Sequence, residues 1–262
     1  MTTIIARSAE SVHWYRAEDG APQYTVKAKD GSARSTTLRD ARKMNLVPSV
    51  TTVLKVMAKP GLDVWKNEQL LLAAMTLPRG LNEPEKDFIT RVVADSKQTV
   101  KSAAEAGTRI HESIQGHYEG KPTTQHHENI KGAVNALNEL YGAQKWKCET
   151  SFSHAELRFG GKCDLHRTIG NTNLKEYGIV LDVKSKEFAE GDKIDTYDEQ
   201  LMQLAAYRHG LGVPFALCAN VFVSRNHPGV VKVVEWSEED LIRGWEMFQC
   251  ILKFWKLKNS FL

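Results

Sequence analysis

Two short polar motifs contain the residue types from which a hydrolytic site can be built. One is Gly161-Lys162-Cys163-Asp164 and the other, further along the chain, is Asp182-Val183-Lys184. In an extended strand, residues i and i+2 share a face, so Asp182 and Lys184 lie together while Val183 points away, into a core. A carboxylate beside a lysine, joined by a second carboxylate from a neighbouring strand, can hold a divalent cation and orient an attacking water. The pattern predicts a site that hydrolyses a phosphodiester.

The segments around these motifs favour strands. Residues that alternate with a period of two predict strands near 146–154, 161–169 and 177–185, with turns at 159–161 and 170–173. A helical period predicts two helices before them, over 84–120 and 125–141. After the strands we expect a helix over about 196–211, strands near 215–224 and 229–236, and a last helix from Ser237. The predicted order is two helices, three strands, a helix, two strands and a helix.

The N-terminal residues predict smaller elements. Residues 12–30 favour a β-hairpin that turns at Asp19-Gly20, and Thr37 is suited to cap a short basic helix that contains residues 39–43. Further helix is expected over 48–57 and 62–77. Trp14, Tyr15, Trp65 and the basic helix could stack bases and bind the phosphates of a single strand, but core packing of the aromatic rings is an equal alternative.

The composition is that of a globular protein with an unevenly distributed positive charge. Of 262 residues, 42% are hydrophobic and 26% are charged, which is typical of a globular protein. The net charge of +3 is unevenly spread, because residues 1–60 contain ten Lys and Arg against five Asp and Glu. Such an excess suits contact with a polyanion, although a solvated surface is the more ordinary explanation.

The four cysteines and the apolar runs bear on the compartment. The cysteines lie far apart without a CxxC pair, so neither a zinc site, an iron–sulfur cluster nor a disulfide framework is indicated. The sequence contains no recognisable secretory signal and no apolar run of about 20 residues. We therefore expect an intracellular, cytoplasmic protein that makes no membrane contact.

Four pieces of sequence occur in one order: Gly107-Thr108-Arg109-Ile110-His111, Gly161 to Asp164, Asp182 to Lys184, and Gln203-Leu204-Ala205-Ala206-Tyr207. Together they resemble the PD-(D/E)XK nuclease superfamily, above all its RecB-type and phage-exonuclease branch. Residues 48–54 are also similar to the opening of phage exonucleases and of the mitochondrial genome maintenance exonuclease. The resemblance implies an α/β fold. Its restriction-endonuclease-like core, over residues 84–262, has a central mixed β-sheet flanked by helices. An N-terminal β-hairpin and helical arm over residues 1–83 would contact DNA.

The metal ligands follow from residue chemistry and from this resemblance. Asp164 and Asp182 supply hard oxygen ligands, which suit Mg²⁺, with Mn²⁺ as a substitute. The resemblance adds the backbone carbonyl of Val183 and the imidazole of His111 to the metal shell. Lys184 would hold the attacking water and offset the charge that develops on the phosphate.

Three further residues are implied to border the active site. Gln203 and Tyr207 lie four residues apart on one helical face, and the resemblance makes them the element beside the catalytic groups. Glu149, on the strand before Asp164, faces the same site in some relatives.

These roles imply a Mg²⁺-dependent DNA exonuclease that processes single- or double-stranded ends in phage-type recombination, replication or repair. Two alternatives stay open: an endonuclease of the same fold, of the junction or restriction type, and a recombination accessory protein that binds DNA without turnover. A homo-oligomer, or a partner protein in recombination or replication, is compatible with each of these functions.

Overall fold

The computed structural model describes residues 13–168 and 177–261. Within these residues the strands are β1 (Trp14–Arg16), β2 (Thr25–Lys27), β3 (Ala33–Ser35), β4 (Leu46–Pro48), β5 (Lys147–His154), β6 (Phe159–Thr168), β7 (Gly178–Lys186), β8 (Leu217–Ser224) and β9 (Val231–Glu235). The helices are α1 (Leu38–Lys43), α2 (Val50–Leu54), α3 (Pro60–Thr76), α4 (Glu85–Tyr118), α5 (His127–Tyr141), α6 (Asp198–Gly210) and α7 (Glu238–Lys258). The turn predicted at 170–173 lies outside the described residues.

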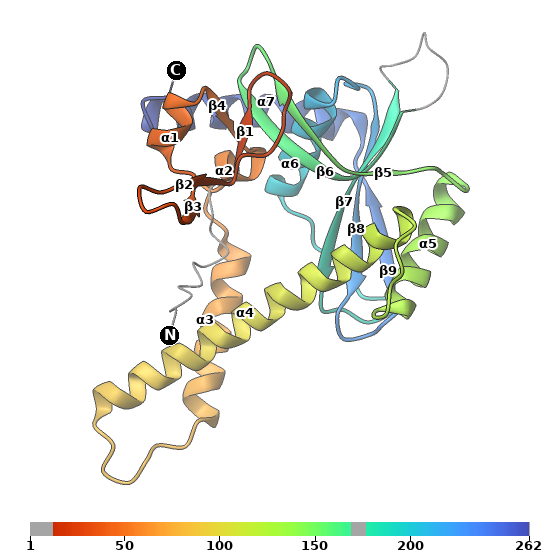
Figure 1. Cartoon of the computed structure of the whole chain (residues 1–262). Coiled ribbons are helices and arrows are strands. Elements are labelled where there is room, and N and C mark those ends of the chain that lie inside the picture. The colour runs from red at the N-terminus through yellow and green to blue at the C-terminus, as the bar shows by residue number, and fades with distance from the viewer. Residues whose placement is uncertain (1–12, 169–176, 262) are drawn as a thin grey trace.

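The main sheet contains five strands in the order β5-β6-β7-β8-β9. Its neighbours are antiparallel except for β7 and β8, which run parallel because α6 crosses over between them. α4 and α5 pack on one face of the sheet, and α6 and α7 on the other (Figure 1). The chain is therefore an α/β protein whose mixed sheet is flanked by helices, as the sequence predicted.

Successive side chains of β7 point to opposite faces of the sheet and so contact both helical layers. Ile179, Leu181 and Val183 belong to the hydrophobic cluster beneath α4 and α5, whereas Val180 belongs to the cluster beneath α6 and α7. Val183 is 9% exposed and belongs to the first of these clusters, which confirms the prediction that it points into a core. Asp182 is also buried, on the α6 side, so its carboxylate must find its partners within the protein.

The N-terminal strands confirm the predicted hairpin in part. The turn at Asp19-Gly20 forms, with Gly20 at φ +70°, and Tyr15 and Pro22 form an antiparallel bridge across it. The N–H of Arg16 donates to the carbonyl of Ala21, and that of Gln23 to the carbonyl of Trp14. The longer strand pairs are made elsewhere. β1 pairs with β4, and β2 pairs with β3. Trp14 is fully buried and Tyr15 is 2% exposed, so neither ring offers a face to a nucleic-acid base. Of the two readings of these aromatic residues, core packing is the one that the structure supports.

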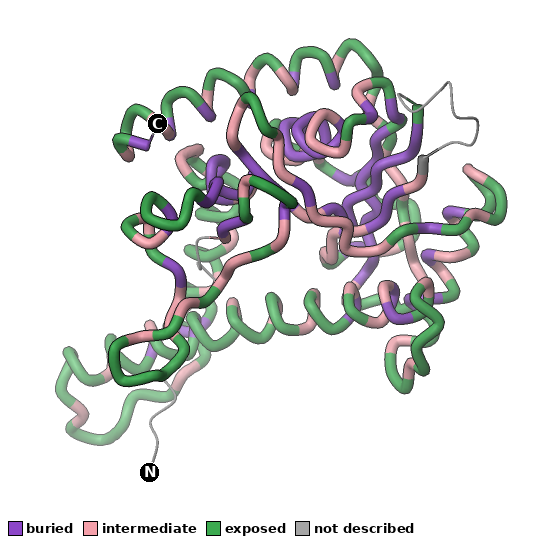
Figure 2. Tube along the Cα trace, turned by 45° about the horizontal axis from the view of Figure 1, so that its top comes forward, coloured by how far each residue is buried: buried purple, intermediate pink, exposed green. Residues whose placement is uncertain are grey.

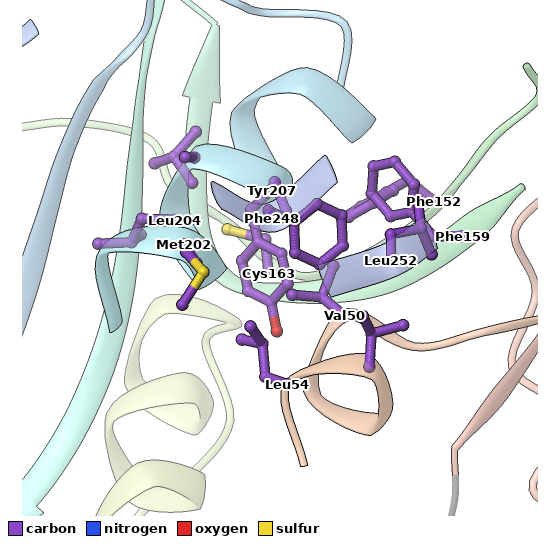
Figure 3. Close-up of a cluster of buried hydrophobic side chains, with 14 of the residues drawn as sticks. Val50, Leu54, Phe152, Phe159, Cys163, Met202, Leu204, Tyr207, Phe248 and Leu252 are labelled. Atoms are coloured by element: carbon purple, nitrogen blue, oxygen red, sulfur yellow. The ribbon is translucent and has the colours of Figure 1, made fainter. Parts of the chain in front are cut away.

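The segment that contains β1, β4 and α2 belongs to the main core. Trp14, Val50 and Leu54 are members of the cluster that also contains residues of α6 and α7. Figure 3 shows Val50 and Leu54 of α2 close to the ring of Tyr207 on α6. α2 is shorter than predicted, and α3 begins at Pro60, a residue that suits the first turn of a helix. The predicted boundary between residues 83 and 84 falls between α3 and α4, which pack on each other.

α3 and the first half of α4 form an arm that projects from the sheet (Figure 1). Most of its surface is exposed (Figure 2), including large apolar side chains such as Met75 at 81% and Leu81 at 98%. Even so, among residues 13–168 and 177–261 no helix is both long enough and apolar enough to cross a membrane.

His209 makes the stability of the α6–α7 layer sensitive to pH. Its ring stacks on that of Trp245 with centroids 3.9 Å apart, and burial lowers the pKa of His209 to about 4. The unfolded chain, whose histidines titrate near 6.5, therefore binds more protons than the folded chain between pH 6.5 and 4, and stability falls as the pH drops through this window. We expect a loss of about 1–2 kcal/mol, discounted for partial exposure of the ring.

Thermal unfolding at pH 7 and pH 4.5 measures this effect. A His209→Phe variant keeps the ring contact with Trp245 but cannot take up a proton, so acidification should lower its melting temperature less than that of the wild type. Equal losses in the two proteins would contradict the assignment to His209.

Candidate metal centre

Three elements bring the candidate ligands together. α4 carries His111, β5 carries Glu149 and β6 carries Asp164. One turn before His111, Gly107 faces β7 so closely that a Cβ atom there would lie 2.4 Å from Ser185 Oγ. The absence of a side chain at Gly107 therefore lets the second half of α4 approach the sheet, which places His111 over the edge where the carboxylates lie.

His111, Glu149 and Asp164 converge on one point. Their nearest ligand atoms all lie within 4.8 Å of one another. His111 Nε2 is 3.4 Å from Asp164 Oδ1 and 3.5 Å from Glu149 Oε1. The side chains are only 16–26% exposed, so the group is partly screened from water. An imidazole with two carboxylate oxygens around one point is a donor set for a divalent cation.

The backbone of β5 departs from regular strand geometry at Glu149. The β5–β6 ladder pairs Cys148 with Leu165 and Thr150 with Cys163, which places Glu149 opposite Asp164. Glu149 has φ +51°, in the left-handed region that costs a residue with a side chain about 1 kcal/mol or more. The fold therefore accepts backbone strain at a residue whose carboxylate faces His111.

Asp164 is held by the backbone of the next strand. The β6–β7 ladder runs from Leu165↔Leu181 to Thr168↔Gly178, and beyond it the N–H of Val183 donates to Asp164 Oδ2 at 2.7 Å. The other oxygen, Oδ1, remains directed at His111. The contact of Val183 that the structure contains is thus made by its N–H, and the predicted role of its carbonyl as a metal ligand stays a prediction.

Asp182 sits in a separate network beside this group. Its Oδ1 accepts hydrogen bonds from Lys184 Nζ at 2.8 Å and from Gln203 Nε2 at 2.7 Å, and its Oδ2 accepts one from Asn220 Nδ2 at 2.8 Å. The carboxylate is 2% exposed, so these donors replace water around it. Because its oxygens already have partners, Asp182 first of all fixes Lys184, and its predicted role as a direct metal ligand stays a prediction.

Gln203 and Tyr207 complete that network from α6. Gln203 Oε1 accepts from Lys184 Nζ at 3.3 Å, and Gln203 Nε2 also donates to the hydroxyl of Tyr207 at 3.0 Å. Tyr207 is 4% exposed, and its ring lies 5.7 Å from that of Phe152 in the core. The two residues therefore anchor Lys184 and Asp182 to the hydrophobic layer, which agrees with the expectation that they border the site.

The charged groups perturb one another. Burial acts to lower the pKa of Lys184, but the carboxylates of Asp182 and Asp164 outweigh it and raise that pKa, so the side chain stays an ammonium. Burial raises the pKa of Asp182, with Lys184 opposing and Asp164 adding to the rise. Burial also opposes ionisation of Asp164, yet its hydrogen bond with His111 lowers the pKa of Asp164 below the ordinary value. Asp164 is the more readily ionised of the two acids, which suits a metal ligand.

Sequence reasoning missed two residues of the site, Lys162 and Asn220. Lys162 Nζ forms an ion pair with Glu149 Oε2, and Asn220 donates to Asp182 as described above. Both had a signal in the sequence. Lys162 precedes Asp164 by two residues, so the two share a strand face, and Asn220 is a lone amide in the apolar strand β8.

Two hollows of the described surface lie elsewhere. One, of about 360 Å³, is lined by residues that include Arg109, Glu112 and Lys121, on the side of α4 that faces away from His111. Another, of about 250 Å³, lies between α1 and the end of the chain near Phe261. Neither includes a ligand of the candidate centre. The donor atoms of the candidate centre converge, whereas neither hollow is lined by a comparable group.

Comparison of the chain with protein-family models gave no match, and no curated protein matches it. Among solved structures, the crystal structure of SSO0001 is similar over 45% of this chain, with 16% sequence identity and a TM-score of 0.27. The similarity covers 57% of the SSO0001 chain, so this chain spans little more than half of its length. Both the identity and the TM-score are too low to indicate a function.

Proposed function

We propose that this protein is a divalent-metal-dependent deoxyribonuclease that works as an exonuclease on DNA ends, in recombination, replication or repair. The observation that carries the proposal is the convergence of His111, Glu149 and Asp164, from three separate elements, beside an ammonium group that Asp182 holds in place. The resemblance of the four sequence motifs to PD-(D/E)XK nucleases points to the same chemistry.

The donor set fits a hard divalent ion. Glu149 and Asp164 each direct one carboxylate oxygen at His111 Nε2, and the other oxygen of each is held by a hydrogen-bond donor or an ion pair. Carboxylate oxygens suit Mg²⁺ and Mn²⁺, and an imidazole is compatible with Mn²⁺. When bound, such an ion would lower the pKa of a coordinated water and polarise a phosphate oxygen. His111, Glu149 and Asp164 would hold it.

Lys184 supplies fixed positive charge for the reaction. Its Nζ is hydrogen-bonded to Asp182 and Gln203, and the raised pKa keeps it protonated at neutral pH. A fixed ammonium in a partly buried position stabilises the negative charge that develops on a phosphate during hydrolysis. We therefore assign Lys184 to charge stabilisation and to orienting the nucleophile by hydrogen bonding, because a protonated amine cannot act as a base.

The charge distribution favours one side of the molecule for DNA contact. Residues 13–59 contain nine Lys and Arg against four Asp and Glu, whereas residues 60–106, which form most of the arm, contain six against seven. Contacts with DNA phosphates depend on positive charge. We expect the segment that contains β1 to α2, rather than the arm helices, to contact the DNA backbone.

The test is incubation of the purified protein with Mg²⁺ or Mn²⁺ and three DNA substrates: end-labelled single strand, end-labelled duplex and a covalently closed circle. We expect the linear DNA to be shortened progressively from an end, the circle to stay intact, and excess EDTA to stop the reaction. Product lengths over time also give the direction of digestion.

Other results would replace the proposal. A cut circle would identify an endonuclease of the same fold. DNA that is bound in Mn²⁺ but never cut would favour a non-catalytic binding protein. Cleavage that persists in EDTA would exclude the metal mechanism.

A further inference from the structure

Glu149 divides its carboxylate between a histidine and a lysine. Oε1 faces His111, on the side where a metal ion would bind, while Oε2 forms the ion pair with Lys162. Asp164 has a comparable division, but there the outer oxygen accepts from the neutral N–H of Val183. The ammonium on Glu149 therefore differs from the other support of the centre, because it carries a charge that repels a cation.

Lys162 and Lys184 are held in different ways. Lys184 is tied to Asp182, which is 2% exposed, and also to Gln203. The side chains of Lys162 and Lys184 are similarly exposed, at 36% and 34%, so exposure does not distinguish them. Lys162 forms its ion pair with Glu149 and, among the described residues, has no second hydrogen-bond partner like Gln203, although Asp164 is an electrostatic neighbour. A long flexible side chain held by one ion pair can move at little cost. Lys162 is thus the movable positive charge of the site, and Lys184 the fixed one.

The net charge of the centre explains why a bound metal ion would release Lys162. Glu149, Asp164 and Asp182 carry three negative charges, and Lys162 and Lys184 carry two positive charges. A divalent ion turns a net negative centre into a net positive one, and a DNA phosphate restores the balance. An ion on Oε1 also weakens the hold of Glu149 on Lys162, because the carboxylate and the ion then neutralise each other.

The positively charged N-terminal segment lies next to Lys162. Tyr24 and His13, whose rings lie 4.6 Å apart, are electrostatic neighbours of Lys162 on the N-terminal segment. This segment carries the excess of positive charge described above. A lysine that leaves Glu149 would therefore remain close to the side on which we expect the DNA backbone.

We infer that Lys162 is an exchangeable counter-ion of Glu149: a divalent ion releases it, and the released ammonium binds a DNA phosphate next to the centre. The second step rests on the proposed function, but the first does not. Because the coupling is reciprocal, metal and DNA each increase the affinity of the protein for the other, and Lys162 carries this coupling.

The first experiment measures metal binding without DNA. In calorimetric titrations with Mn²⁺, the Lys162→Gln variant should bind the ion about tenfold more tightly than the wild type, because the competing ammonium is gone. Lys162→Arg should bind Mn²⁺ like the wild type, since it keeps the charge. Lys253→Gln, which removes an exposed lysine from α7 on the far side of the sheet, is the matched control and should also behave like the wild type.

The second experiment measures the coupling. In a Lys184→Ala background that prevents cleavage, fluorescence anisotropy of a short labelled single strand is recorded with and without Mn²⁺. Mn²⁺ should increase DNA affinity about tenfold when Lys162 is present, and about twofold or less in Lys162→Gln. Far-UV circular dichroism confirms that each variant is folded, and Lys162→Met, which also removes the charge, replaces the Gln variant if that variant is not folded.

The outcomes separate this inference from the proposed function. Unchanged or weaker Mn²⁺ binding in Lys162→Gln would overturn it, and weaker binding would mean that Lys162 merely orients Glu149. A wild type that binds no Mn²⁺ would overturn it as well. A protein that behaves as expected in the Mn²⁺ titrations but cuts no DNA would retain the exchange at Glu149 and lose the nuclease.

Discussion

A Lys184→Ala variant is expected to cleave DNA about a thousandfold more slowly than the wild type, because it loses the fixed ammonium that stabilises charge on the phosphate. Asp182 keeps the donors Gln203 and Asn220, so its carboxylate remains hydrogen-bonded and the protein should still fold. Initial rates on an end-labelled duplex measure the effect, and calorimetry should show that Mn²⁺ is still bound.

The matched control for this variant is Lys186→Ala, two residues further along β7. Lys186 Nζ lies 6.0 Å from the centre of the Tyr197 ring, and its removal takes away an equal charge from the same strand. We expect cleavage within about threefold of the wild type. Equal losses at both positions would mean that positive charge near the strand end, rather than the contact of Lys184 with Asp182, supports the reaction.

An Asp164→Asn variant is expected to weaken Mn²⁺ binding about 100-fold and to lose cleavage with it. Its amide oxygen can still accept from the N–H of Val183, and its amide nitrogen can face His111, so the fold should be retained. Calorimetry with Mn²⁺ and thermal unfolding test both parts. Asp87→Asn, an exposed position on the arm, is the control and should change neither.

Asp164 is a better test position than Asp182. An amide at 182 would place its NH₂ group either against Lys184 and Gln203 or against Asn220, so at least one buried donor loses its acceptor. An Asp182→Asn variant would therefore lose stability together with activity. Normal Mn²⁺ affinity in folded Asp164→Asn protein would remove Asp164 from the metal centre.

Local patterns were sufficient to predict most elements. The helical period over 84–120 became α4, and the period-two segments became β5, β6 and β7, because burial of one face imposes these repeats on the sequence. Thr37 caps α1 and Ser49 caps α2, since a side-chain oxygen there can accept from a free N–H of the first turn. Such signals depend on residues within a few positions of one another.

Pairing between distant segments was beyond those patterns. The turn signal at Asp19-Gly20 correctly predicted the short bridge between Tyr15 and Pro22, but not the pairing of β1 with β4 about thirty residues away. Nothing within either short strand specifies its partner. What decides the pairing is the burial of Trp14 among residues from both ends of the chain, including Trp255 and Phe261.

The sequence indicated which residues lie together at the site, but not the hydrogen bonds that join them. His111, Glu149 and Asp164 do come together, yet the division of labour with Asp182 follows from hydrogen bonds that require the strand register. Asn220 lies opposite Asp182 only because β7 and β8 are parallel and paired in that register. A sequence pattern gives the face of a strand, but not which residue on the next strand it meets.

α4 is one helix of 34 residues, about 51 Å from end to end. Its N-terminal half packs against α3 away from the sheet, and its C-terminal half carries His111, which faces Glu149 and Asp164. Beside His111, Ile110 and Ile114 are buried against the sheet, so a molecule that tilts the outer end of α4 would strain this packing and shift the imidazole relative to the strands. We expect such a molecule to be detected as a changed Mn²⁺ affinity, even though it touches none of the ion's ligands.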